Sequence, residues 1–414
     1  MMERLAVWFK DSLAGTLEYD GKTNSFVFAY SSDYLSSPKA LALSVKLPLR
    51  EEAYDAYETK KFFENMLPPE VVRRKLEVVL GISAGNVFGC LKVLGRDCAG
   101  AISIFPEGES PNVELRNEKV LTLTEAEAEA AIRSLRERPL LVGFHEGFRM
   151  SATGAQDKIV ARVRDGRLAL PLYGAASTDI VKPAASRLPE SVFNEMFCQR
   201  LASCCGIDAA ECDIVRFGKE TCYRTIRFDR YVKDGIVRRH HQEDFCQALG
   251  IEAERKYQDE GGPSVRGCLL AMRKMRLGFA EQRKFIEHIA FTYLIGNADA
   301  HGKNHAILYR NGQAILAPLY DAMCTAVYET ATTHMAMRIG SAVTFEDVRR
   351  TSFGEMADAC DIGRKFAFDI LDRCATSVGD KAKALAEELS DTVGSSPIYK
   401  QIIKVIDNQR HRVK

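Results

Sequence analysis

The chain has 414 residues, 46% of them hydrophobic, and a formal net charge of +1. That length suffices for two or three domains with cores of their own, and the near-neutral charge excludes a protein that holds nucleic acid through a global basic field. Glu3, Arg4, Lys10 and Asp11 place charges among the first eleven positions, and no apolar run reaches 18 residues, so we expect no secretory signal, no membrane span and a cytoplasmic location. The twelve cysteines are irregularly spaced, which favours reduced, mostly buried thiols over disulfides or structural zinc.

Residues 1–110 predict a small α+β domain. Its expected elements are strands at 5–9, 25–30 and 101–105 and a helix over 62–80 that is interrupted by Pro68 and Pro69. The Pro- and Gly-containing stretch at 106–111 is the best linker in the chain.

Residues 111–240 predict a second region, rich in strands. A helix should begin at Thr124, with Glu127 completing a capping box, and should end by Pro139. The other expected elements are strands at 158–163, 167–172, 180–181, 214–215 and 223–228 and a helix at 189–205. Residues 241–414 predict a mostly helical third region with one hairpin. Strands followed by helices favour an α+β protein with two lobes over a doubly wound sheet.

The stretch NADAHGKN, residues 297–304, follows an apolar run with helical spacing at 285–294. A largely buried helix therefore leads the loop into the interior, where Asp299 needs a metal, a lysine or a substrate hydroxyl as partner. Asn311-Gly312 lies between two apolar runs just downstream and predicts a hairpin. Because a hairpin folds back on itself, Asn304 before it and Asp321 after it should converge with Asp299.

Protein kinases use this constellation for phosphoryl transfer. A catalytic-loop Asp accepts the hydroxyl proton, an Asn five positions later binds one Mg²⁺, and an Asp beyond a hairpin binds the other. Asp299 and Asn304 have that spacing, and Asp321 follows the hairpin. The sequence thus favours a phosphotransfer site; the alternative is a buried polar loop held by structural hydrogen bonds. His301 could brace the loop or contact a ligand directly.

A kinase also needs a phosphate cradle and a lysine. The small residues of 150–158 would let backbone N–H groups face an anion, although the stretch could equally be a plain turn. Lys182 lies in an apolar strand, where phosphates or Glu195 would balance its charge; a snorkelling lysine is the alternative. Residues 227–230 lie where a hinge between lobes would read adenine through the backbone, with Phe228 as an apolar wall or an ordinary core residue.

Together these stretches resemble the HipA family, the serine/threonine kinase toxins of bacterial HipBA toxin–antitoxin modules. The matching segments, in family order, are FFENMLP at 62–68, SATGAQDK at 151–158, Asn194-Glu195, RFDR at 227–230, QEDFCQ at 242–247, Lys256-Tyr257 with Gly261-Gly262-Pro263, GNADAHGKN at 296–304 and LAPLYD at 316–321. Family members often carry Glu where this chain has Ile226, a difference of little consequence for a backbone contact.

The resemblance implies a two-lobed protein-kinase-like fold with ATP and Mg²⁺ as cofactors. It implies that Asp299 is the catalytic residue, that Asn304 and Asp321 hold Mg²⁺ and that Ser151 is the site of inactivating autophosphorylation. The implied ATP-site residues are Thr153, Gly154, Ala155, Gln156, Asp157, Lys158, Lys182, Ile226, Arg227, Phe228, His301, Gly302, Lys303, Asn304, Tyr320 and Asp321.

The resemblance also implies partners: an aminoacyl-tRNA synthetase as the phosphorylated protein, and a HipB-like helix-turn-helix antitoxin through which DNA is contacted. Two other functions stay open. Asp-x-His-x-x-Asn, at 299–304, also resembles the loop of small-molecule kinases of the aminoglycoside or choline type, which leaves the N-terminal domain unexplained. A catalytically dead, DNA-associated corepressor is the other, against which the intact acids argue.

Overall fold

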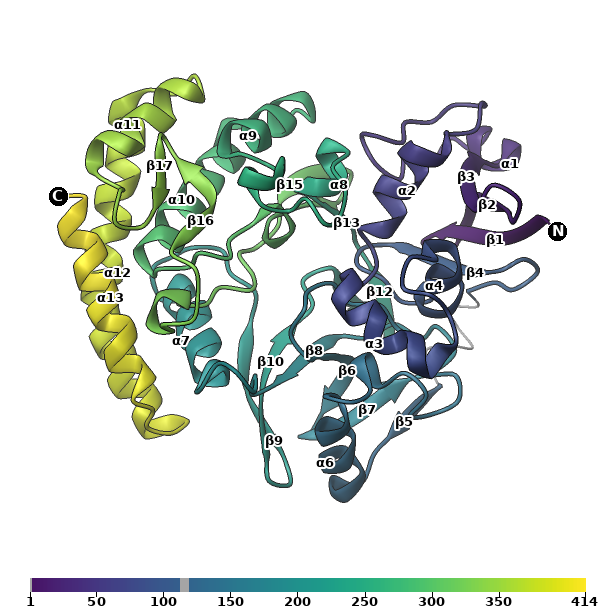
Figure 1. The fold of residues 1–414 in the computed structure, drawn as a ribbon, viewed down its shortest axis with the longest axis horizontal. Helices are drawn as coiled ribbons and strands as arrows, with labels where there is room; N and C mark the ends of the chain where they lie inside the picture. Colours follow the sequence, from purple (N-terminus) through teal and green to yellow (C-terminus); the bar gives the residue numbers. More distant parts are fainter. Residues whose placement is uncertain (1, 112–118) are drawn as a thin grey trace.

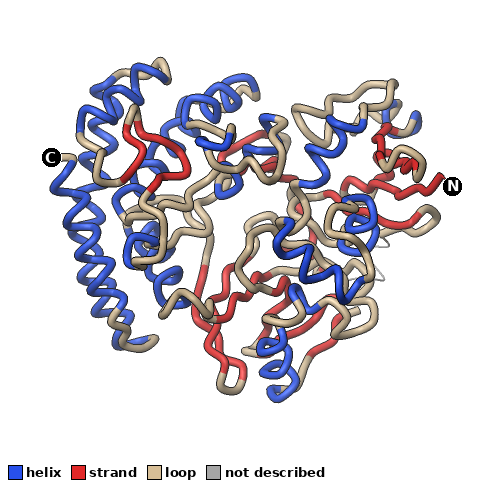
Figure 2. Tube along the Cα trace, in the orientation of Figure 1, coloured by secondary structure: helices blue, strands red, loops and turns tan. Residues whose placement is uncertain are grey.

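A computed structural model describes residues 2–111 and 119–414. Figures 1 and 2 show an N-terminal part, a central strand-rich part and a helical C-terminal part, so the α+β, two-lobed fold with a small N-terminal α+β subdomain is confirmed. The described chain has three large apolar cores, and the core of the C-terminal part also takes in buried residues between 192 and 202 of the central part. The boundaries predicted at residues 110 and 240 stay predictions.

The N-terminal part is a four-stranded antiparallel sheet with helices on it. The strand order is β3-β2-β1-β4. The elements are β1 (Met2–Phe9), β2 (Ser12–Asp20), β3 (Ser25–Tyr30), α1 (Ser32–Leu35), α2 (Ala56–Glu64), α3 (Glu70–Leu80), α4 (Val87–Leu94) and β4 (Ile102–Pro106). The predicted break at Pro68-Pro69 separates α2 from α3. The sequence missed β2, because Gly15 interrupts its pattern; Gly15 is needed there because a Cβ would lie 2.1 Å from the carbonyl oxygen of Ala29.

The central part is a six-stranded sheet of order β5-β7-β6-β8-β10-β9. Its elements are β5 (Val120–Thr122), α6 (Glu125–Ser134), β6 (Ile159–Arg164), β7 (Arg167–Pro171), β8 (Asp179–Pro183), α7 (Ser191–Cys204), β9 (Cys212–Phe217) and β10 (Glu220–Ile226). The predicted capping box is present, with Thr124 and Glu127 satisfying each other's backbone N–H groups. A two-stranded hairpin that was not predicted, β11 (Arg230–Lys233) with β12 (Ile236–Arg239), follows the sheet.

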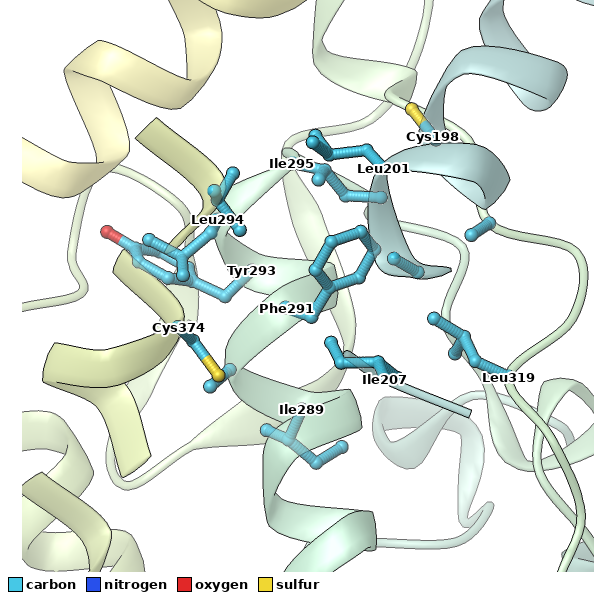
Figure 3. Packing of buried hydrophobic residues seen from close by; sticks show 14 of the residues in the cluster. Cys198, Leu201, Ile207, Ile289, Phe291, Tyr293, Leu294, Ile295, Leu319 and Cys374 are labelled. Carbon is cyan, nitrogen blue, oxygen red and sulfur yellow. The ribbon is translucent and has the colours of Figure 1, made fainter. Parts of the chain in front are cut away.

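The C-terminal part is mostly helical, as predicted, around a core that Figure 3 shows from close by. Its elements are β13 (His241–Asp244), α8 (Phe245–Leu249), α9 (Val265–Lys274), α10 (Phe279–Leu294), β14 (Ala306–Arg310), β15 (Gln313–Leu316), β16 (His334–Ile339), β17 (Ala342–Thr344), α11 (Arg350–Ala359), α12 (Arg364–Thr392) and α13 (Ile398–Arg412). Strands β13, β14 and β15 form one sheet.

The expectation of a single hairpin in this part is wrong, because β16 and β17 form a second one. Its turn is Gly340-Ser341, with Gly340 at φ +61°, where the sequence offers no Asn-Gly or Asp-Gly signal. In the part of the chain that the structure describes, we find no helix long and apolar enough to cross a membrane.

Candidate active site

The loop at residues 296–304, which the sequence predicts to be catalytic and which is called the catalytic loop below, begins where the buried helix α10 ends. Gly296 turns the chain at φ +69°, and the Asn297 side chain then accepts a hydrogen bond from the Asp299 N–H at 3.0 Å. From the other side, Asn304 Nδ2 donates to the Asp299 carbonyl oxygen at 2.8 Å. The backbone of Asp299 is therefore fixed by two amide side chains.

The Asp299 carboxylate is not buried as predicted: its side chain is 50% exposed. Its partner is a hydroxyl of the chain itself, because Tyr257 Oη donates to Oδ1 at 2.6 Å. Partial burial raises the pKa of Asp299, and Lys256 and the Tyr257 hydrogen bond oppose that rise. A half-open carboxylate at the end of a buried loop suits a group that must meet a substrate.

The β14–β15 hairpin brings the second acid to the same place. The Ala317 N–H donates to the Ala306 carbonyl oxygen at 2.9 Å, which closes the hairpin end, and the Tyr320 hydroxyl donates to the Lys303 carbonyl oxygen at 2.7 Å. The charge of Asp321 is close enough to contribute to the raised pKa of Asp299. Asp321 itself has φ +59°, a strained backbone conformation of the kind held at functional sites.

Lys182 links Asp321 to the central sheet. It lies on β8, is buried, and its Nζ is 2.5 Å from Glu195 Oε1 on α7 and 2.5 Å from Asp321 Oδ1. Burial lowers the pKa of Lys182, but the two carboxylates outweigh it and hold the pKa above its usual range. Burial likewise raises the pKa of Asp321, yet Lys182 outweighs it and holds the carboxyl ionised. The snorkelling alternative for Lys182 does not apply, since its own side chain is buried and one of its partners, Glu195, lies inside.

The stretch at 151–158 approaches this ion pair. Lys158 is buried with its Nζ 2.8 Å from the Gln156 carbonyl oxygen, and burial together with the charge of Lys182 lowers the pKa of Lys158 to about 8. Gly154 has φ +93°, and a Cβ there would lie 2.9 Å from Lys158 Nζ. Lys158 and Lys182 thus lie beside a loop of small residues whose backbone N–H groups could face an anion, and this region is called the cradle. Thr153, Ala155 and Asp157 lie on the same loop, at its partly or fully exposed positions.

Ser151, at the start of that loop, is buried against the N-terminal part. Its Oγ donates to the Met66 carbonyl oxygen at 2.6 Å, and its N–H donates to the Asp97 carbonyl oxygen at 3.2 Å. Met66 belongs to the FFENMLP stretch that follows α2. The N-terminal part therefore directly holds the stretch at 151–158, which the sequence predicts to bind phosphate.

Residues 227 and 228, which follow β10, point into two different environments. The Arg227 guanidinium is buried among Asp229, Ser177 and the Cys98 carbonyl oxygen, so its side chain does not face the lysines of the cradle. The Phe228 ring lies 5.3 Å from the Tyr320 ring, and within the described residues its backbone N–H has no hydrogen-bond partner. Ile226 is exposed at the strand end. An apolar wall beside a free backbone donor is what a nucleobase needs.

Three loop residues, His301, Gly302 and Lys303, hold the loop in place. Lys303 Nζ bonds to Asp244 Oδ2 at 2.6 Å and to Asn65 Oδ1 at 2.7 Å, which ties the catalytic loop to the N-terminal part. His301 is buried; its Nδ1 accepts the Lys303 N–H at 3.2 Å, and its Nε2 lies 2.8 Å from Lys256 Nζ. Burial and the Lys256 charge lower the pKa of His301 to about 3, so the imidazole is neutral. Gly302 packs on Pro263, since a Cβ there would lie 2.3 Å from Pro263 Cγ.

Sequence reasoning assigned no role to Asn65, Asp97, Asp244 or Tyr257, which all contact the site residues. Each lies far along the chain from its partner; Tyr257 is 42 positions from Asp299 and Asn65 is 238 from Lys303. Local pattern carries no signal for such pairs. Only their membership of the quoted family motifs singled out Asn65, Asp244 and Tyr257.

The protein kinase class is defined by an Asp-x-x-x-x-Asn loop, an acid beyond a hairpin and a strand lysine paired with a helix glutamate. This chain has all three features. Comparison with known proteins gives the family. The model of the HipA-like C-terminal domain matches residues 150–382, and that of the HipA N-terminal domain matches residues 5–105. The chain belongs to the HipA family and is a serine/threonine protein kinase.

Relatives match over nearly the whole chain. "Putative kinase Y4mE" of Sinorhizobium fredii is 38% identical over 94% of this chain and 92% of its own length. The serine/threonine-protein kinase toxin HipA of Shewanella oneidensis is 28% identical over 91% of this chain and 87% of its own. A solved structure of the Shewanella HipA, HipB and operator DNA complex superposes with a TM-score of 0.83 at 26% identity, covering 98% of this chain and 95% of that one.

Proposed function

We propose that the protein transfers the γ-phosphate of ATP to a serine or threonine hydroxyl of another protein and acts as the toxin of a toxin–antitoxin module. The observation that carries this is the buried Lys182 ammonium, held at 2.5 Å from both Glu195 and Asp321 beside a half-open Asp299. A structural loop has no need of an ionised acid, a buried lysine and an open carboxylate at one place.

The residues present fit magnesium and ATP. The side-chain N–H of Asn304 donates to the Asp299 carbonyl oxygen, so the side-chain oxygen of Asn304 is left to bind a metal. Lys182 keeps the Asp321 carboxyl ionised. Amide and carboxylate oxygens are the ligands that Mg²⁺ takes, and the metal supplies charge neutralisation on the phosphates. Asn304 and Asp321 would hold it.

The rest of the chemistry falls to the chain's own groups. Lys158, Lys182 and the N–H groups of residues 153–158 would bind the phosphates, and Phe228 and Tyr320 would flank the adenine, with Ile226 and Arg227 contributing backbone. Asp299 would orient the acceptor hydroxyl and take its proton. His301, Gly302 and Lys303 hold that loop in place.

Ser151 is proposed as an autophosphorylation site that switches the kinase off. In the described state its hydroxyl is buried and donates to a carbonyl oxygen, so a phosphate there, carrying about −2 charge, would face a carbonyl oxygen instead of donating to it. The loop would have to leave the N-terminal part, and the cradle around Lys158 would be lost.

The partners are proposed from the relatives. A HipB-like antitoxin and, through it, DNA fit the Shewanella complex, and the near-neutral net charge agrees with DNA contact made mainly by the partner. An aminoacyl-tRNA synthetase is the proposed substrate, and the cytoplasm the proposed location.

The test is incubation of the protein with labelled ATP and a cell lysate, wild type beside Asp299→Asn, followed by identification of the labelled protein. We expect one or a few labelled proteins with the wild type and loss of label with the variant, while thermal melting and ATP binding persist. Label found on an aminoglycoside or choline instead would favour a small-molecule kinase. Equal, background labelling by both proteins, with ATP bound, would favour the corepressor.

A further inference from the structure

The Asp299 carboxylate has a partner that the proposed function does not explain. Its Oδ1 accepts from the Tyr257 hydroxyl at 2.6 Å, and within the described chain no other side chain donates to it at hydrogen-bond distance; His301 Nε2 is 3.9 Å away. Asn297 and Asn304 fix only the backbone of Asp299. The rotation of the carboxyl group is therefore set by Tyr257.

We propose that Tyr257 is a positioning residue that holds Oδ1 of Asp299 and so leaves Oδ2 to face the acceptor hydroxyl. The inference rests on the proposed phosphotransfer by Asp299. A carboxyl group that rotates freely is often not oriented toward the acceptor hydroxyl. A misplacement of about 1 Å can lower the rate of the chemical step about 100-fold.

The structure holds Tyr257 as firmly as this role requires. Its carbonyl oxygen accepts from the Glu260 N–H at 3.0 Å and from the Gly262 N–H at 2.8 Å, which winds the segment into a tight turn. A Cβ on Gly262 would lie 2.6 Å from that same oxygen, so this turn needs glycine. The Tyr257 ring also meets the His301 ring edge-on, with 5.4 Å between centroids.

The turn is joined to the catalytic loop at two further points. The Gly302 N–H donates to the Lys256 carbonyl oxygen at 3.3 Å, and Pro263 covers Gly302 so closely that no side chain fits. On its far side, Asp259 forms an ion pair with Arg338 of β16 at 2.6 Å. Tyr257 and Asp299 thus lie on two segments that pack as one unit, 42 residues apart in the chain.

One rival reading uses the same contact. A hydroxyl bonded to the catalytic base is also where an acceptor would lie, so Tyr257 could itself be phosphorylated. The hydrogen-bonded turn speaks against this, because the phenol is tied to Asp299 through a segment held at both ends. Phosphotyrosine at position 257 of the purified protein would overturn the positioning role.

The test compares Tyr257→Phe with wild type in phosphate transfer from labelled Mg·ATP to lysate protein. We expect the apparent kcat to fall about 10- to 100-fold, with the KM for ATP and the melting temperature unchanged, because the phenol touches the base and not the nucleotide cradle. Tyr19→Phe is the matched control: it removes a phenol that donates to the Asn24 side chain at 2.9 Å, far from the site, and should change neither constant.

The Asp299→Asn variant distinguishes a failure of the positioning role of Tyr257 from a failure of the proposed function. If phosphate transfer is lost in Asp299→Asn but is unchanged in Tyr257→Phe, the positioning role is wrong and the proposed function stands. Transfer that survives in Asp299→Asn would sink both. A Tyr257→Phe defect that falls on the KM for ATP, or that comes with a lower melting temperature, would assign the phenol a structural role instead.

Discussion

Asp97 offers the sharpest stability prediction. It precedes β4 in the N-terminal part and is fully buried. Its Oδ1 accepts from Arg230 at 2.8 Å and forms an ion pair with Arg239 at 2.8 Å, while Oδ2 accepts from the Ser177 hydroxyl at 2.7 Å. Burial raises the pKa of Asp97, but the neighbouring arginines outweigh it and keep the carboxyl ionised. The residue thus fastens the N-terminal part to the segment that follows β10.

The number of charges in this cluster sets how much Asp97→Asn should lower the free energy of unfolding. The arginines at 227, 230 and 239 face two carboxylates, Asp97 and Asp229, and the variant leaves them only Asp229. Breaking a buried ion pair by removing one partner costs about 3–5 kcal/mol. The amide oxygen of Asn can still accept one hydrogen bond, so we expect the lower end, about 3 kcal/mol.

The assay is urea unfolding followed by circular dichroism, with Asp11→Asn as control. Asp11 pairs with Arg238 at 3.3 Å on the surface, where its side chain is 57% exposed, and such a pair contributes under about 1 kcal/mol. A clear drop in the first unfolding midpoint for Asp97→Asn, beside a small one for Asp11→Asn, is the expected result. Equal shifts for the two variants would refute the reasoning.

Three further predictions follow from other contacts. Burial raises the pKa of Glu243 from 4.5 to about 7 in the folded protein. As pH rises between these values, Glu243 ionises more readily in the unfolded chain, so the free energy of unfolding falls. The melting temperature of Glu243→Gln should therefore depend less on pH in this range than that of the wild type. Lys303→Met removes the ammonium group that pairs with the largely buried Asp244 carboxylate and should lower the melting temperature. Lys365→Met removes an exposed ion pair on a helix surface and should leave the melting temperature unchanged. Gly302→Ala must displace Pro263 and should reduce phosphate transfer about 10- to 100-fold, while Gly278→Ala, with nothing within 4 Å of its added Cβ, should leave transfer unchanged.

The sequence predicted those parts of the site that local pattern determines. The helical spacing before Asn297, the Asn311-Gly312 turn and the five-residue step from Asp299 to Asn304 are all short-range, and from them the meeting of Asp299 with Asp321 could be inferred. The pairing of Lys182 with Glu195 was also predicted, because a strand lysine needs an acid and the following helix supplies one.

Long-range pairing accounts for what was missed. Lys303 and Arg227 looked like ligands of the nucleotide, but partners in the N-terminal part, Asn65 and the Asp97 cluster, engage their side chains. Asp299 was expected to be buried, whereas the fold leaves it half open and supplies the Tyr257 hydroxyl. No periodicity signals such contacts, since they depend on how the three parts pack together.

The most direct measurement is a crystal structure of the protein with Mg²⁺ and a non-hydrolysable ATP analogue. The account predicts phosphates between Lys182 and the loop at 153–158, the metal on oxygens of Asn304 and Asp321, and the adenine against Phe228. A nucleotide bound elsewhere, or Asp299 and Asp321 on opposite sides of a closed wall, would contradict it.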